Sequence, residues 1–556
     1  MTKLTALDWI VIAAYFLILL AIVVVELRRQ KTATEYFLAG RNAGFFVIGG
    51  SIFATNIGSE HIVGLAGQGA STGLAVAHYE LHAWIVVLLA WVFVPFYYHA
   101  GVFTMPEFLE RRFGPRPRWM LSLVSLAAYV LTKVSVTVYA GALVFSALLP
   151  DTFGSPQNAF WIGAMLTVVV TGLYTVAGGL RIVLYTDAAQ ALILILGSVF
   201  LMYFGLQALG GWGELTAFAN QHVAEFALWR PLSDPDFPWL GMLIASPVVG
   251  IWYWCTDQYI VQRTLAAKSL TAARRGALFG AFLKVWPVLI FLVPGLLGAA
   301  LDARGALAIP TGPNGAHLTD QVFPTMVATL LPAGLRGLVV AALLAALMSS
   351  LSSLFNSTAT LFTVDVYGKL RPQASQARIV LVGRLATLVV TGLGLLWIPV
   401  MPLVSGGGLY QYLQNVQSYL APPITAVFLL GLTSSRINTR GATWGLGLGF
   451  VLGFGKLVIQ AFFGAGKIDT PAVLAAIGDF NFLYFSGVLF LICVVTSIVA
   501  SLLDEPPDPN RIKGLTFASL DRAAVRATVD WKDIAATVVV LGLVAGLYLY
   551  FSFWIG

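Results

Sequence analysis

The sequence predicts an all-α polytopic membrane protein with about 14 transmembrane helices, each of the length that crosses a bilayer. Of its 556 residues, 58% are apolar and only 10% are charged, whereas a soluble domain carries about a quarter charged residues. The mean hydropathy is +0.85. The charges cluster between apolar runs of roughly 20 residues, which is the spacing of membrane spans. We therefore expect residues 1–556 to form a single transmembrane domain in a lipid bilayer.

The excess of basic residues is a topology signal. Lys and Arg number 32 against 25 Asp and Glu, but they lie in short loops and form no single basic face, so no nucleic-acid partner is expected. Loops such as "ERRFGPRPR" and residues 263–275 are basic, whereas residues 210–238 and 301–332 are neutral or acidic. The positive-inside rule then places both termini outside the plasma membrane, or the inner membrane of a bacterial cell. Cys255 and Cys493 lie in apolar segments, so neither a disulfide framework nor a cysteine metal site is expected.

The spans divide into a repeated core with additions. Residues 7–27 form an extra first span, residues 44–209 and 239–432 form two sets of five spans, and residues 441–553 form three more. Because five is odd, the second set must enter the membrane from the opposite face, which predicts inverted repeats. The leading span of each set is interrupted by glycine, proline and polar residues, in "FATNIGSEHIVG" and "ASPVVGIWYWCTDQ". Paired interruptions predict a binding site near the membrane midplane.

Several ionisable side chains fall inside predicted spans, where an unpaired charge costs at least about 2.5 to 3.5 kcal/mol. Lys456 is expected to snorkel or to face neighbouring protein, and Lys133 is expected to be structural. Glu80 and Lys284 lie near the ends of their spans, so an interfacial position is an alternative to a role in a site. Composition alone does not decide between these readings.

Six stretches resemble the sodium/glucose cotransporter branch of the solute:sodium symporters. They are "ATNIGSEHIVGLAG", "WVFVPFYYHAGVFTMPEFLERRFG", "YTVAGGLRIVLYTDAAQ", "WYWCTDQYIVQR", "LMSSLSSLFNSTATLFTVDVYGK" and "APPITAVFLL", spread from about residue 30 to about residue 450. The resemblance implies a leucine-transporter-like fold and a secondary active symporter that imports a hexose by alternating access. It also implies sodium as the coupling ion and no organic cofactor.

The resemblance further implies a sugar site shared by the two halves. Its residues would be Asn56, His61, Tyr79, Glu80, Tyr253, Trp254, Lys284 and Gln414. Hexose hydroxyls donate and accept hydrogen bonds, so carboxylate, amide, imidazole and ammonium groups suit them, and an aromatic ring can lie against the C–H face of the sugar. Core packing is the alternative for the two aromatic residues of the second half. Gly250 is a departure, because relatives commonly carry a small hydroxyl residue there.

Two cation sites are implied in the same way. The main sodium site would use the carbonyl oxygens of Ala54, Ile57 and Ala346 with the hydroxyls of Ser349 and Ser350, and neutral oxygens suit a hard monovalent cation. A possible second sodium site would add Asp187, Ser352 and Ser353, and would give two ions per cycle. Close helix packing by small residues is the alternative reading of "MSSLSSLFNST". Asp257 is expected to link helices rather than to contact substrate.

Other classes of function fit the sequence less well. An enzyme is not expected, because the sequence has no HExxH motif, nucleophile motif or phosphate loop. A membrane sensor with a transport-like domain is an alternative, but the loop near residues 504–532 is too short for a catalytic domain. Among transporters, a symporter of inositol or another small solute is the alternative to a hexose symporter. The sequence leaves the oligomeric state open.

Overall fold

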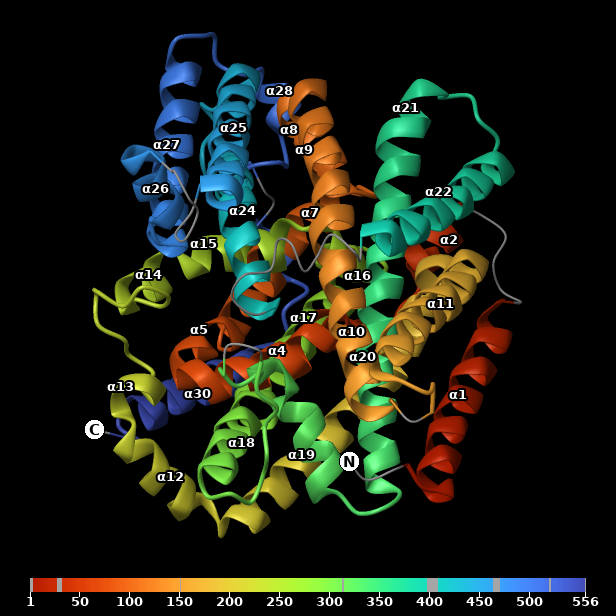
Figure 1. Cartoon of the computed structure of the whole chain (residues 1–556). Coiled ribbons are helices and arrows are strands. Elements are labelled where there is room, and N and C mark those ends of the chain that lie inside the picture. Colours follow the sequence, from red (N-terminus) through yellow and green to blue (C-terminus); the bar gives the residue numbers. More distant parts are fainter. Residues whose placement is uncertain are drawn as a thin grey trace.

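The computed structural model describes residues 4–27, 33–150, 152–312, 315–397, 409–463, 471–519 and 522–555. Within these ranges the chain is helical, and its few extended residues form only isolated β-bridges. Figure 1 shows the helices gathered around α20, which runs through the middle of the molecule. The all-α prediction is confirmed.

Short helices and bends interrupt many of the spans in the first half of the chain. Up to residue 226 the α-helices are α1 (Ala6–Leu27), α2 (Ala33–Leu38), α3 (Phe45–Asn56), α4 (Ser59–Thr72), α5 (Ala77–Glu80), α6 (Ala83–Leu88), α7 (Val94–Ala100), α8 (Met105–Phe113), α9 (Pro115–Ala128), α10 (Ser135–Leu148), α11 (Pro156–Leu209), α12 (Trp212–Gln221) and α13 (Val223–Phe226). Two π-helical turns, η3 (Leu89–Phe93) and η4 (Tyr129–Val134), join α6 to α7 and α9 to α10.

The second half begins with short pieces and ends with long helices. Its α-helices are α14 (Trp239–Ile244), α15 (Ser246–Ile251), α16 (Gln258–Leu265), α17 (Leu270–Lys284), α18 (Val293–Ala303), α19 (Val322–Leu330), α20 (Leu335–Thr360), α21 (Gly368–Leu370), α22 (Gln376–Trp397), α24 (Leu409–Thr433), α25 (Thr439–Phe463), α26 (Ala472–Asp479), α27 (Phe482–Leu502), α28 (Pro509–Ile512), α29 (Arg522–Arg526) and α30 (Trp531–Ser552). The π-helical turns here are η5 (Trp252–Thr256), η6 (Val288–Leu292) and η8 (Leu361–Tyr367).

Among the described residues, 11 helices are long and apolar enough to cross a membrane, which confirms a multi-pass membrane protein. The number 14 stays a prediction. Helix α11 shows why the two counts differ: its 54 residues would extend about 81 Å at 1.5 Å per residue, far more than a bilayer core of about 30 Å. It bends at Gly179, where φ is 50° and ψ is −153°. The spans predicted near residues 158–178 and 182–209 are its two legs.

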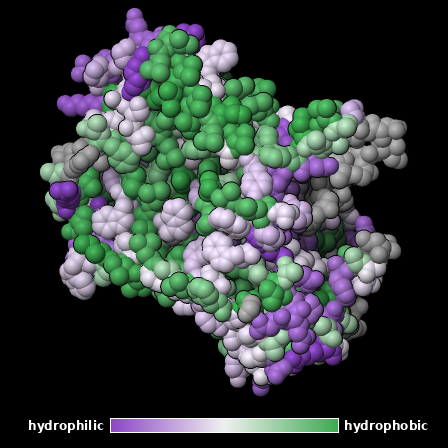
Figure 2. Space-filling view, turned by 90° about the vertical axis from the view of Figure 1, so that its left-hand side faces the viewer, coloured by the Kyte–Doolittle hydropathy of each residue, from purple (hydrophilic) through white to green (hydrophobic). Residues whose placement is uncertain are grey.

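The outer surface is apolar over wide areas. Leu173, Leu385, Val451 and Leu491 are each more than half exposed. In Figure 2 hydrophobic residues cover much of one face, while hydrophilic residues gather towards its upper left and lower right. A soluble monomer rarely exposes such large apolar patches, so this surface fits contact with lipid.

Both predicted interruptions are real breaks in helices. The first separates α3 from α4 at Ile57 and Gly58, whose ψ angles of 87° and −179° are not helical. The second follows η5 at Asp257, whose φ and ψ of −83° and 128° are extended. A backbone bridge ties the segment before α3 to the segment after α16: the Ala43 amide donates to the Ala266 carbonyl at 3.0 Å, and the Lys268 amide donates to the Ala43 carbonyl at 3.2 Å. The prediction of paired interruptions is confirmed.

Helix α20 forms the centre of the core. Every residue of α20 from Ala345 to Thr360 is buried, whereas only Asp533, Val540, Val544 and Phe551 are buried in α30 at the periphery. Helix α4 meets α18 and the preceding turn η6 with almost no space between the backbones. A Cβ atom added at Gly295 in α18 would lie 2.0 Å from the Ala66 carbonyl oxygen, and one added at Gly69 in α4 would lie 2.2 Å from the carbonyl oxygen of Leu292 in η6. Only glycine permits this approach.

We therefore expect Gly295→Ala to push α4 away from α18. Overpacking of this kind costs about 1 to 3 kcal/mol, which thermal unfolding of the purified protein in detergent would detect as a lower midpoint. Gly542→Ala in α30 is the control, because nothing lies within 4 Å of an added Cβ there. Equal midpoints for the two variants would contradict the close contact.

Candidate functional site

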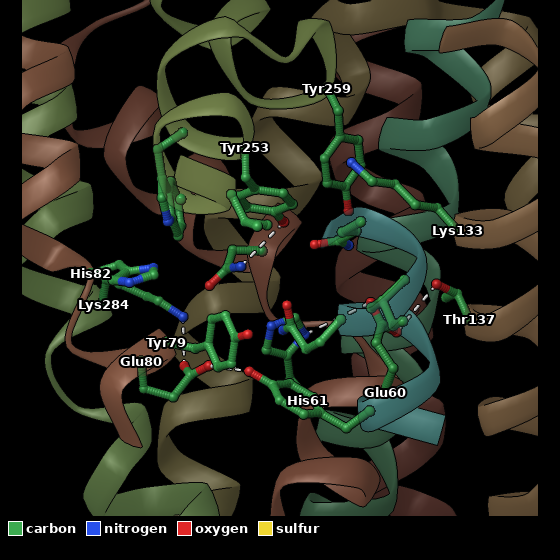
Figure 3. Close-up of a pocket in the computed structure, with 18 of the residues that line it drawn as sticks. Glu60, His61, Tyr79, Glu80, His82, Lys133, Thr137, Tyr253, Tyr259 and Lys284 are labelled. Atoms are coloured by element: carbon green, nitrogen blue, oxygen red, sulfur yellow. Dashed lines mark hydrogen bonds and ion pairs between the residues drawn. The ribbon is translucent and has the colours of Figure 1, made fainter. Parts of the chain in front are cut away.

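A pocket lies beside both helix breaks and is shown in Figure 3. Its cavity volume is about 50 Å³. All eight residues of the predicted sugar site line it. They come from α3 and α4 (Asn56, His61), α5 (Tyr79, Glu80), η5 (Tyr253, Trp254), α17 (Lys284) and α24 (Gln414). The structure thus brings together residues from both predicted halves, and their binding role stays a prediction.

Glu80 and Lys284 form a buried ion pair in the pocket wall. The Lys284 Nζ atom lies 2.5 Å from Glu80 Oε2, and the Tyr410 hydroxyl donates to Glu80 Oε1 at 3.3 Å. Both charged side chains are at least 97% buried, so neither is an ordinary interfacial charge. A pair of this kind presents a carboxylate acceptor and an ammonium donor side by side.

Three polar atoms on the pocket wall have no hydrogen-bond partner among the described residues. They are Asn56 Oδ1, His61 Nδ1 and the Tyr79 hydroxyl. The amide of Asn56 uses its other end, since Nδ2 donates to the Tyr253 hydroxyl at 3.1 Å. Buried polar groups in folded proteins are nearly always hydrogen-bonded, so a polar ligand is the natural partner for these atoms.

The structure also places residues in the pocket that the sequence interpretation missed. Glu60 follows the first break and accepts a hydrogen bond from the Thr137 hydroxyl at 3.2 Å. Tyr410 and Gln417 stand four residues before and three after Gln414, so one helix face presents all three to the pocket. That spacing was a usable signal once Gln414 had been chosen.

Gly250 lines the pocket as well, and His82 takes the space of the missing side chain. A Cβ atom at Gly250 would lie 2.8 Å from His82 Nδ1 and 2.5 Å from Ile85 Cδ1. The other ring nitrogen of His82 lies 3.2 Å from the Ser246 hydroxyl. An imidazole therefore fills the space beside Gly250 in the pocket wall.

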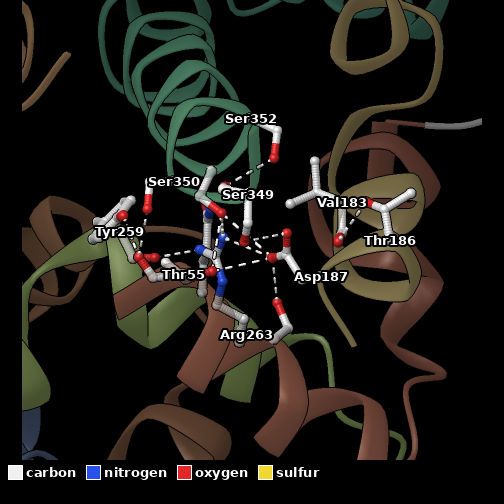
Figure 4. Close-up of polar contacts among 12 residues, drawn as sticks. Thr55, Val183, Thr186, Asp187, Tyr259, Arg263, Ser349, Ser350 and Ser352 are labelled. Atoms are coloured by element: carbon white, nitrogen blue, oxygen red, sulfur yellow. Dashed lines mark hydrogen bonds and ion pairs between the residues drawn. The ribbon is translucent and has the colours of Figure 1, made fainter. Parts of the chain in front are cut away.

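A second polar cluster surrounds Asp187, where α11, α3 and α20 meet (Figure 4). The carboxylate accepts hydrogen bonds from Ser51 at 2.7 Å, Thr55 at 3.1 Å, Ser349 at 2.7 Å and Ser353 at 3.4 Å. Ser51 and Thr55, one helical turn apart on α3, are additions to the predicted set. Ser352 turns away, because its hydroxyl donates to the Ser349 carbonyl at 2.9 Å.

Arg263 brings a positive charge to this cluster. Its Nη2 atom lies 3.8 Å from Asp187 Oδ2 and donates to the Ser353 hydroxyl, and the side chain is fully buried. The motif "WYWCTDQYIVQR" includes this arginine, but the sequence interpretation gave it no role. The carboxylate is therefore paired without any added ion.

The predicted main sodium site falls between the first break and α20. Ala54 and Ile57 lie at the end of α3, Ala346 and Ser350 lie on α20, and all are fully buried. The Ser350 hydroxyl donates to the Thr55 carbonyl at 3.3 Å. Ser350 thus touches the broken turn, whereas Ser349 points to Asp187. The ion-binding role of these residues stays a prediction.

The sequence also matches known proteins over most of its length. A sequence model of the sodium:solute symporter family matches residues 36–449. The chain belongs to the sodium:solute symporter family. This symporter is 40% identical over 555 residues to sodium/myo-inositol cotransporter 2 of Oryctolagus cuniculus, covering 94% of this chain and 80% of the relative. It is 38% identical over 538 residues to sodium/glucose cotransporter 1 of the same species, covering 90% of this chain and 80% of the relative.

A solved structure shares the fold of this symporter. It is a sodium-coupled sialic acid symporter in a substrate-bound, outward-open state, with a TM-score of 0.75 at 23% identity over 91% of this chain and 99% of that chain. Together with the family match, the finding identifies a multi-pass, sodium-coupled solute symporter of a family of transporters. Sodium is its coupling ion and a small molecule is its substrate.

We expect substitutions in the Glu80–Lys284 pair to affect the unfolding temperature and the uptake of solute in different ways. Glu80→Gln or Lys284→Gln alone leaves one buried charge unpaired, which costs about 3 to 5 kcal/mol. The double variant leaves no net charge and should unfold nearer to the wild-type temperature, while uptake stays impaired in all three. Thermal unfolding in detergent measures the first effect and uptake into proteoliposomes the second.

Glu214→Gln is the control for this pair. Glu214 contacts Arg304 at 2.5 Å, but the two side chains are 50% and 43% exposed. An exposed pair contributes about 0 to 1 kcal/mol, so the variant should unfold close to the wild type. Additive destabilisation in the double variant of Glu80 and Lys284 would contradict the pairing.

Proposed function

We propose that this symporter imports a hexose of the glucose or galactose type together with sodium by alternating access. The observation that supports this most is the convergence of the eight predicted residues on one pocket beside both helix breaks. In that pocket an amide oxygen, an imidazole nitrogen and a phenol have no hydrogen-bond partner among the described residues, and the imidazole nitrogen lies 3.8 Å from a Glu60 carboxylate oxygen. A ring of hydroxyls can donate to and accept from such groups in place of water.

The proposed contacts follow from the chemistry of each side chain. Glu80 accepts hydrogen bonds from sugar hydroxyls, while Lys284 and Gln414 donate to them. The rings of Tyr253 and Trp254, 5.0 Å apart and nearly perpendicular, offer one face to the C–H surface of the sugar. Tyr253 is the proposed inner gate, because its ring lies next to the second break.

Sodium binding at the first break is proposed to order the sugar site. Ions held by the carbonyls near Ala54 and Ile57 would fix the turn that carries Asn56 and His61. Each ligand then raises the affinity of the other by the same factor. The proposed architecture behind this motion is two inverted sets of five spans, residues 44–209 and 239–432, with additions at residues 7–27 and 441–553 and with both termini outside.

The number of ions sets the gradient that uptake can reach. At about 100 mV one inward charge supplies roughly 2.3 kcal/mol, and a tenfold sodium gradient adds about 1.4 kcal/mol. One ion then supports a sugar ratio of about 500-fold and two ions support about 10⁵-fold. We propose a main ion site at Ala54, Ile57, Ala346 and Ser350. We propose a second at Asp187 with Ser349 and Ser353, next to the guanidinium of Arg263; the Ser352 hydroxyl, which donates to the Ser349 carbonyl, is left out of it.

A myo-inositol symporter is the second candidate. A relative named sodium/myo-inositol cotransporter 2 is 40% identical to this chain, and inositol also presents a ring of hydroxyls. The two candidates differ in the ring oxygen and in the hydroxyl pattern, which competition can separate.

Uptake of labelled glucose into proteoliposomes tests both candidates. We expect uptake that requires an inward sodium gradient and is reduced by unlabelled galactose. Stronger competition by inositol than by galactose would favour the second candidate. Uptake that proceeds equally with potassium in place of sodium would overturn the proposed coupling.

Two variants should separate the ion site from the sugar site. Ser350→Ala removes a hydroxyl at the first break, so we expect a higher sodium requirement and slower sugar uptake together. Gln414→Ala removes a sugar donor from α24, so we expect mainly a higher KM for sugar, by roughly tenfold for one lost hydrogen bond to a hydroxyl. Uptake measured over a series of sodium and sugar concentrations distinguishes the two.

Ser486→Ala is the matched control for the serine. Ser486 is also a fully buried serine, but it lies on the peripheral helix α27, away from the pocket and the Asp187 cluster. Its sodium dependence should equal that of the wild type. A Ser350→Ala variant with unchanged sodium dependence would refute the assignment of the main ion site.

A further inference from the structure

Lys133 is a buried cation in the wall of the sugar pocket, enclosed by aromatic rings. Its Nζ atom lies 2.5 Å from Asp257 Oδ2. The same atom lies over four rings, with distances to the ring centroids of 4.5 Å for Tyr259, 4.8 Å for Tyr253, 4.9 Å for Trp252 and 5.1 Å for Tyr129. A cation over an aromatic face is attracted by the ring quadrupole, and more strongly where water is excluded.

The carboxylate partner of Lys133 stands at the second helix break. Asp257 is the extended residue between η5 and α16, and its side chain caps α16 by accepting a hydrogen bond from the Tyr259 amide at 3.2 Å. The Tyr129 hydroxyl donates to the same carboxylate. The ion pair therefore joins η4 to the residue at which the second broken helix changes direction.

Two of the four rings extend from Lys133 to the first helix break. The Tyr253 hydroxyl accepts a hydrogen bond from Asn56 Nδ2 at 3.1 Å, on the sugar side of the break. The Tyr259 hydroxyl donates to the Thr55 carbonyl at 2.5 Å, and that carbonyl also accepts from Ser350, on the ion side. Figure 3 shows Lys133 next to Tyr259, with Tyr253 on the neighbouring wall of the pocket.

We propose that Lys133, held by Asp257, is the positioning residue that couples sodium binding at the first break to sugar binding in the pocket. This proposal rests on the proposed function. The ammonium group fixes the rings of Tyr253 and Tyr259 relative to one another, so a shift of the Thr55 turn is passed to the ring that faces the sugar. Without the charge the two rings lose their common anchor and the two breaks move independently.

Equilibrium binding of labelled sugar to the purified full chain, with and without saturating sodium, measures this coupling directly. For the wild type we expect sodium to tighten sugar binding by a factor of about 5 to 150, as for other coupled sites. For Lys133→Met we expect sodium to change the sugar affinity by a factor close to one. The sugar affinity measured without sodium should change much less than the affinity measured with saturating sodium. The effect of sugar on sodium affinity must fall by the same factor, because coupling is reciprocal.

Two further variants distinguish coupling from general damage. Lys133→Arg keeps the positive charge and should retain a sodium effect. Lys456→Met removes another buried lysine, one that donates to the carbonyls of Ile477 and Gly478 at 2.7 and 2.6 Å and does not line the pocket. We expect it to lower the unfolding temperature but to leave the coupling factor unchanged.

The results separate this proposal from the one on which it rests. If the sugar affinity of the wild-type chain is the same with and without sodium, the proposed function would be wrong. If sodium tightens sugar binding equally in the wild type and in a folded Lys133→Met variant, the proposed role of Lys133 would be wrong and the proposed function would stand. If Lys133→Met does not fold, Asp257→Asn tests the same pair, since asparagine also caps helices. Unchanged coupling in that variant would likewise refute the proposal.

Discussion

The absence of hydrogen-bonding solvent in the membrane interior constrains every feature of this symporter. A break in a spanning helix exposes amide and carbonyl groups that lipid cannot satisfy, so it is tolerated only where protein or a polar cavity surrounds it. Both breaks lie beside the same buried pocket, at Ile57–Gly58 and at Asp257. Because an interrupted helix needs polar surroundings, both breaks and the polar groups near them lie in one place. There a hydrophilic solute and a cation can replace water.

Charge pairing is the second expression of the same constraint. Glu80 pairs with Lys284, Asp257 with Lys133, and Asp187 lies near Arg263. Each pair joins segments far apart in the sequence, and each stands next to the pocket or to the first break. A pair that crosses between packed segments both neutralises charge and fixes geometry, so substituting one partner disturbs the stability of the fold and the shape of the site together.

Much of this arrangement was predictable from the sequence, for identifiable reasons. Apolar run length predicted the spans, and glycine, proline and polar residues predicted both breaks. The eight pocket residues came from a resemblance, and the structure brings them together without testing their roles. What the sequence could not provide were partners across space: nothing local links Lys133 to Asp257, or Arg263 to Asp187. Side-chain direction was equally hidden, since consecutive residues Ser349 and Ser350 point to different partners.

The short backbone bridge between Ala43 and the residues after α16 has a consequence for how tightly ion movement is tied to solute movement. It fastens one end of each broken helix to the other, so these two ends have few independent degrees of freedom. A conformational change that moves both helices as a joined pair passes through fewer partly opened intermediates than one in which each helix moves alone. Fewer such intermediates mean fewer opportunities for an ion to slip across without its cargo.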